Sequence, residues 1–146
     1  MLKGNTVLWA LLPLCAVFSA MLFAQDATST RDGVYTAAQA AQGQTLYKQQ
    51  CASCHGATLQ GSGQNPALKG DAFLQNWMGM TAGDLYLKIQ ATMPATTPGS
   101  LKPVQVSQLI AYILTMNGYP AGKTELSSKS ADLYKIHFEM PLQSGN

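Results

Sequence analysis

The sequence predicts an all-α domain of about four or five short helices, preceded by an apolar leader. Three observations lead to this fold class. Helix-favouring stretches carry apolar residues at helical spacing, no stretch alternates as a strand would, and glycine or proline residues separate the stretches. A chain of 146 residues, 47% hydrophobic and 11% charged, is enough for one such domain with a modest core.

Residues 1–24 have the layout of a secretory signal peptide. The stretch begins with a single lysine, Lys3, is uncharged from Gly4 onward, and ends in small residues around Ala24. A retained membrane anchor is the alternative, because the apolar run approaches the ~18 to 20 residues of a spanning helix. We favour cleavage, since no basic cluster follows the run. In either case we expect the remaining chain to be exported to the periplasm.

The motif "CASCH" places Cys51, Cys54 and His55 together, while the third cysteine, Cys15, lies in the leader. Structural zinc would need two ligands besides the two thiols, and only His55 and the distant His137 remain. A redox disulfide would need strand-helix alternation that the sequence lacks. A structural disulfide across so short a loop would stabilise little. Two thiols at this spacing can instead each bond a vinyl group of a porphyrin, with the imidazole as an axial iron ligand. The motif therefore predicts one covalently attached haem c.

The segments around the motif predict how the chain would enclose such a group. Residues 36–50 are rich in alanine and glutamine and favour a helix that ends at Cys51. The next stretch, 55–70, holds four glycines and a proline and reads as a loop. A loop of this length should pack against another part of the molecule, and the face of a haem is one such surface.

Three further helices follow in the sequence. Asp71 can cap a short helix over 72–77, and Thr81 with Asp84 forms a capping-box pattern before 85–92. Pro94 should end that helix. The last helix begins at Pro103, although the preceding Lys102 is a poor N-cap, and shows one apolar face: Val106, Leu109, Ile110, Ile113 and Leu114. The tail after Leu126 has no clear hydrophobic period. It is either a wrap, a segment that packs around the domain, or a loose end without such contacts.

The sixth position of the iron would decide the function, because a second strong ligand favours electron transfer and an open site permits gas binding or catalysis. Met93 is our preferred ligand, since Pro94 holds it out of the helix and on a turn. Met80 is the main competitor. The remaining candidates have blander interpretations as surface or core side chains: Met78, Met116, Met140 and His137.

At this point the sequence resembles the small single-haem cytochromes c, which have the class I cytochrome c fold. Within them it is similar to those that accompany quinoprotein alcohol or sugar dehydrogenases. The resemblance covers about residues 41–126 and rests on "LYKQQCASCHG", "NPALKGDAFLQNW", "MTAGDLYLKIQATMP" and "LIAYILTMNGYPAG". It implies a cofactor-binding set of Cys51, Cys54, His55, Met93 and Pro66, in which His55 and Met93 are the metal ligands and the Pro66 carbonyl accepts a hydrogen bond from His55.

The resemblance also implies that the first and last helices cross at Gly43 and Tyr47, opposite Leu109 and Tyr112. The domain would then comprise residues 37–126, after a linker at 25–36 and before a tail at 127–146. Lys102 and the tail depart from the family pattern.

We therefore expect a monomeric one-electron carrier rather than an enzyme. Its partners would be redox proteins, a quinoprotein dehydrogenase as donor and a terminal oxidase as acceptor. The scattered lysines give no field that would identify a nucleic acid or another charged partner. Two alternatives remain: a haem enzyme or gas sensor with a displaceable sixth ligand, and a cytochrome subunit of a dehydrogenase tethered to the membrane by an uncleaved leader.

Overall fold

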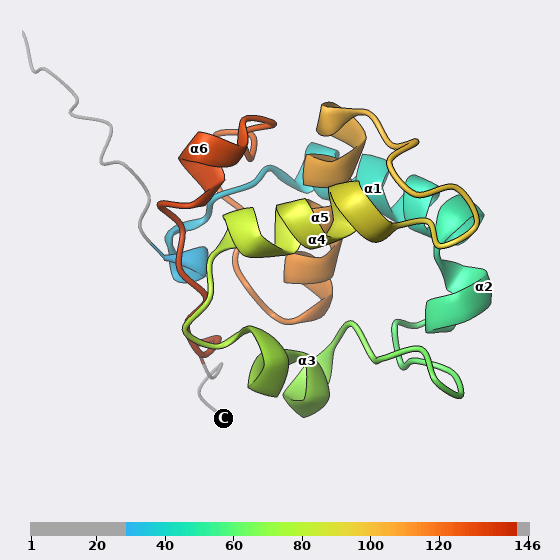
Figure 1. The fold of residues 1–146 in the computed structure, drawn as a ribbon. Coiled ribbons are helices and arrows are strands. Elements are labelled where there is room, and N and C mark those ends of the chain that lie inside the picture. The colour runs from blue at the N-terminus through green and yellow to red at the C-terminus, as the bar shows by residue number, and fades with distance from the viewer. Residues whose placement is uncertain (1–28, 143–146) are drawn as a thin grey trace, which may run out of the picture.

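The computed structural model describes residues 29–142, and within this range it contains helices and isolated bridges but no strand. The predicted all-α class is confirmed. The elements are η1 Thr30–Asp32, α1 Ala37–Gln50, α2 Ala52–His55, α3 Gly70–Trp77, α4 Ala82–Thr92, α5 Pro103–Met116 and α6 Ser130–Leu133. Figure 1 shows α2 on one side of the molecule, with η1 and α6 on the other. The predicted leader, with Cys15, lies outside the described residues.

Local sequence signals set the bounds of α1 and α4. The Thr36 side chain accepts a hydrogen bond from the Gln39 amide and caps α1, which ends before Cys51. Thr81 and Asp84 form the predicted capping box of α4: the Thr81 hydroxyl accepts from the Asp84 amide at 3.2 Å, and the Asp84 carboxylate accepts from the Thr81 amide at 2.8 Å. Helix α4 ends at Thr92, two residues before Pro94.

The expected cap of α3 is wrong. The helix begins at Gly70, so Asp71 lies in its first turn and Lys69 takes the N-cap position without a side-chain bond. The amide of Gly70 donates instead to the Asn117 side-chain oxygen at 2.9 Å, and Asn117 stands directly after α5. A capping partner 47 residues away in the sequence leaves no local signal.

Helix α5 starts at Pro103 and buries all five residues of its predicted face. The Lys102 side chain makes no capping bond, but the Lys102 amide donates to the Gln105 side-chain oxygen at 2.9 Å. Gln105, at the third position of α5, thus accepts a hydrogen bond from the N-cap amide and stabilises the start of the helix although the Lys102 side chain does not cap it.

Helices α1 and α5 cross at Gly43. A Cβ atom at this position would overlap the carbonyl group of Gln108 and lie 3.0 Å from the Cβ of Tyr112. One turn along α1, the ring of Tyr47 lies 5.4 Å from the ring of Tyr112. Gln108 and the expected Tyr112 are therefore the residues of α5 nearest to Gly43, and the expected Leu109 is not among the nearest atoms.

The C-terminal segment is a wrap and lies between two other parts of the backbone. The amide of Phe138 donates to the Met80 carbonyl at 2.9 Å, and the amide of Thr30 donates to the His137 carbonyl at 3.0 Å. The segment buries apolar side chains that have no helical or strand period in the sequence: Leu126, Leu133, Ile136 and Phe138. The tail closes the core beside the start of α4.

The described part of the predicted linker also packs on the domain. Val34 and Tyr35 are buried, and the Tyr35 hydroxyl donates to the Tyr119 carbonyl at 2.7 Å. Arg31 forms an ion pair with Glu139 of the wrap. Within residues 29–142, none of the helices has both the length and the apolar character that crossing a membrane requires.

Replacing Gly43 with valine should lower the free energy of unfolding by about 3 kcal/mol or more, at the upper end of the range for overpacking. The reason is that the new side chain would meet the backbone of α5 at Gln108, which cannot rotate away. Chemical denaturation measures the effect. Ala41→Val, at an exposed position of the same helix, is the control for the β-branched side chain. Equal stability of the two variants would contradict the crossing.

The Asp84 capping contact should make stability depend on pH. Hydrogen bonds from the Thr81 hydroxyl and amide hold the pKa of Asp84 below its ordinary value. A carboxylate with a lowered folded pKa stabilises the fold above the unfolded value, near pH 4, and loses that effect as the pH falls through the folded value. Asp84→Asn should therefore cost about 1 kcal/mol at pH 7 and much less at pH 3.

Urea denaturation at the two pH values measures this difference. Asp71→Asn, in the first turn of α3, is the matched control and should change little at either pH. If Asp84→Asn lowered the free energy of unfolding equally at both pH values, the ionised carboxylate of Asp84 would not contribute to the cap.

Candidate haem site

A single cavity of about 330 Å³ brings the predicted site residues together. Its volume falls within the range of ~300 to 1,000 Å³ that small-molecule sites occupy. The wall comes from the end of α1, from α2, from the loop that follows it, and from α3, α4 and α5. Apolar and aromatic side chains dominate this wall: Tyr47, Trp77, Leu85, Ile89, Leu101, Leu109 and Ile113.

The turn of α2 places three ligand-type side chains on one face. The amides of Cys54 and His55 both donate to the Cys51 carbonyl, at 3.1 and 2.9 Å, and this closes the turn. Residues at positions i, i+3 and i+4 of a helix share a face. Cys51, Cys54 and His55 accordingly all line the cavity, with Cys51 half-buried, Cys54 exposed and His55 buried.

The loop after α2 orients the imidazole. Nδ1 of His55 donates a hydrogen bond to the Pro66 carbonyl oxygen at 2.9 Å. Because a carbonyl can only accept, the proton lies on Nδ1, and Nε2 keeps the lone pair that a metal ion would use. The loop itself is held by the Tyr47 hydroxyl, which donates to the Gly56 carbonyl at 2.6 Å, and by the fully buried Leu59.

Met93 reaches the same cavity from another element. It is the C-cap of α4, in extended conformation, and its amide donates to the Ile89 carbonyl at 3.0 Å. Its side chain is half-buried, and the next residue, Pro94, is buried and also lines the cavity. The helix therefore delivers a thioether to the cavity that holds the imidazole of His55.

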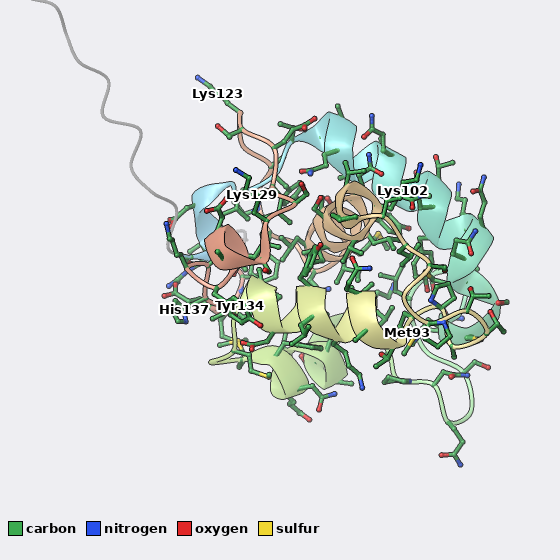
Figure 2. The ribbon with its side chains drawn as sticks, turned by 45° about the horizontal axis from the view of Figure 1, so that its top comes forward. Met93, Lys102, Lys123, Lys129, Tyr134 and His137 are labelled. Atoms are coloured by element: carbon green, nitrogen blue, oxygen red, sulfur yellow. The ribbon has the colours of Figure 1, made fainter. Side chains whose placement is uncertain are left out.

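The competing ligand candidates lie elsewhere. Met78 and Met80 are 38% and 39% exposed, and Met140 is 56% exposed. Met116 packs against the core, while His137 pairs through its backbone with Ser29 and Thr81. Figure 2 shows Met93 at one end of α4 and His137 at the other. Within the described range, none of these candidates lines the cavity.

Burial changes the acidity of two groups in the wall. It raises the pKa of the Cys51 thiol to about 11, with a further contribution from the charge of Cys54. It also raises the pKa of Tyr47 to about 12, so that this hydroxyl stays protonated as a hydrogen-bond donor. Burial in this wall thus favours the neutral forms of Cys51 and Tyr47.

Sequence reasoning missed the polar part of the wall, which includes Asn65, Asn76, Lys88 and Thr96. No capping or ligand motif marks these residues, which lie in the loop before α3, in α3, in α4 and in the loop after α4. The sequence predicts Trp77 only as the end of a short helix. The cation of Lys88 and the amide groups suit an anionic edge of a bound group.

The residues present fit a c-type haem. The wall is apolar, as a macrocycle requires, and the donor set comprises two thiols, one imidazole nitrogen with a free lone pair, and one thioether. Polar and cationic side chains on the same wall suit the two propionates.

The chain resembles a solved structure described as the sulfane dehydrogenase SoxCD from Paracoccus pantotrophus, with 22% identity, a TM-score of 0.43, and coverage of 61% of this chain. The alignment spans about half, 53%, of that longer chain. No curated protein matches the sequence significantly.

A family model matches residues 38–113, more than half of the chain and a range that contains "CASCH" and Met93. The model carries the description cytochrome c oxidase, cbb3-type, subunit III, and it represents a c-type cytochrome family. Such domains transfer electrons through a covalently bound haem c. With a helical fold and a cavity that gathers the attachment motif, the chain belongs to this family of c-type cytochrome domains.

Proposed function

We propose that the protein is a periplasmic one-electron carrier. Cys51 and Cys54 would bond a haem c, and His55 and Met93 would be the ligands of its iron. The observation that carries the proposal is the common cavity: the imidazole enters it from α2 and the thioether from the end of α4. Two ligands from two rigid helix ends suit a site that keeps its coordination in both oxidation states.

The bound haem would supply one-electron redox chemistry, and the chain would tune it. The Pro66 carbonyl fixes the orientation and tautomer of His55 and increases the basicity of its Nε2. The thioether of Met93 is a soft donor that favours ferrous iron and so raises the reduction potential. Apolar side chains such as Leu109 and Ile113 exclude water and lower the local dielectric constant, which stabilises the less charged state.

The export and partner assignments rest on sequence pattern. We propose that residues 1–24 are a cleaved signal peptide, followed by a linker at 25–36, the cytochrome domain at 37–126 and a tail at 127–146. A quinoprotein dehydrogenase would donate the electron to the monomeric carrier, and a terminal oxidase would accept it. Mass spectrometry of the exported protein would establish the mature N-terminus.

A fixed subunit of a larger complex is the second candidate, and the description of the matching family, which names an oxidase subunit, favours it. In that case the leader would be retained as an anchor. A haem enzyme or gas sensor is the third, and it would require Met93 to leave the iron easily.

Both cysteines should be needed for full attachment. Cys51→Ala or Cys54→Ala should abolish the holoprotein or leave a single thioether link, which shifts the absorption bands of the reduced protein. Acid-acetone extraction should leave the haem on the wild-type chain. Ser53→Ala, in the same turn, should behave as the wild type. Free extraction of haem from the wild type would contradict covalent binding.

Met93→Ala should open the iron while the haem stays attached. Ferrous wild-type protein should bind carbon monoxide slowly, and the variant should bind it at least about tenfold faster, because the open fraction of the site no longer limits binding. The reduction potential should fall as water replaces the thioether. Stopped-flow absorption and a redox titration measure the two effects.

Met80→Ala is the matched control, since Met80 is the main competing ligand. If Met80→Ala alone gave the carbon monoxide complex and the lower potential, Met80 would be the axial ligand. If the wild type bound carbon monoxide rapidly, the carrier would give way to the enzyme or sensor alternative.

A further inference from the structure

The segment after Met93 forms a closed loop that returns to α4 before α5 begins. Within the loop, the amide of Thr97 donates to the Pro94 carbonyl at 2.9 Å, and the amide of Ser100 donates to the Thr97 carbonyl at 3.2 Å. Two successive turns thus carry the chain from the end of α4 to Leu101. Leu101 is buried and lines the same cavity as Met93.

A side chain of α4 fastens the far end of this loop. Nε2 of Gln90 donates a hydrogen bond to the Leu101 carbonyl at 2.8 Å. Gln90 lies one helical turn before Met93, and Leu101 lies after it. The bond between Gln90 and Leu101 therefore joins two residues that flank Met93 in the sequence. Among the residues described, no other side-chain hydrogen bond joins α4 to the loop at 94–102.

The other half of the same amide is unsatisfied. Oε1 of Gln90 is buried and has no hydrogen-bond partner among the described residues. A buried acceptor without a partner opposes folding by at least as much as one hydrogen bond contributes. An apolar side chain of the same length would avoid this cost. The glutamine therefore gives the fold little net stability, and its clear effect is the local closure of the loop.

We propose that Gln90 is a positioning residue for Met93: its bond to Leu101 acts as a latch that keeps the thioether at the iron. This inference rests on the proposed function, in which Met93 is an axial ligand. With the latch closed, Met93 is held from both sides, by its amide bond to Ile89 and by the returning loop. With the latch open, the loop can move away and the thioether can leave the iron more often. The latch would then set how fast an external ligand replaces Met93.

The test compares Gln90→Met with a matched control, Gln105→Met, in the holoprotein. Both variants lose one glutamine hydrogen bond to neighbouring residues, because Gln90 binds the Leu101 carbonyl and Gln105 binds the Lys102 amide. Only the first bond ties the loop to α4. The rate at which imidazole binds to the ferric protein reports how often Met93 leaves the iron. It should rise by about two- to tenfold in Gln90→Met, the factor for loss of one net hydrogen bond, and stay at the wild-type value in Gln105→Met.

Gln90→Glu provides a second readout, which depends on pH. A protonated carboxyl can donate to the Leu101 carbonyl, and an ionised one cannot. Relative to the wild type at the same pH, imidazole binding should therefore be near normal in acid and accelerate as the carboxyl ionises. This variant also serves if Gln90→Met does not fold.

The outcomes separate the latch from the ligand assignment. Met93→Ala is measured first, and unchanged imidazole binding in that variant would end the proposed ligation itself. If Met93→Ala binds faster but Gln90→Met matches the wild type, or if Gln105→Met accelerates as much, the latch is overturned while the ligand assignment stands. A rate for Gln90→Glu that follows the wild type at every pH overturns it as well.

Discussion

The close contact between α1 and α5 at Gly43 is the constraint on which the site depends. Because no side chain separates the helices there, the next turn of α1 brings Tyr47 against Tyr112. Tyr47 also donates to the Gly56 carbonyl just after the attachment motif. The crossing therefore fixes the position of the turn at 51–55 relative to the wall that α5 supplies through Leu109 and Ile113.

Helix α4 is the second support of the site and is held at both ends. At its start, the amide of Ala82 donates to the Ile136 carbonyl of the C-terminal wrap, and a Cβ atom on Gly83 would collide with Tyr134. At its end, Gln90 reaches Leu101. The wrap and the loop thus restrict the same helix, whose last residue precedes Met93. A carrier gains from such restraint, because small changes in ligand position keep the reorganisation on electron transfer small.

The sequence anticipated those elements whose signals are local. The motif at Cys51, the capping box at Thr81, and the prolines at positions 94 and 103 act on residues within a turn or two, and the structure has a helix start or end next to each of them. The sequence does not predict the cap of α3, and it leaves the tail as either a wrap or a loose end, because the partners of both lie far away in the chain. Asn117 satisfies the amide of Gly70, and the residues of the wrap pair with segments near Thr30 and Met80.

By itself, the sequence determined the chemistry: two thiols and an imidazole at a spacing that suits a covalent haem, and a methionine that a proline keeps out of the helix. Only the tertiary structure decided which side chains share a cavity. It brings Met93 to the same cavity as His55, leaves Met78 and Met80 partly exposed, and recruits Gln90 to close the loop. The physical reason is that covalent spacing and turn signals act over a few residues, whereas a cavity is enclosed by packing between helices distant in the chain.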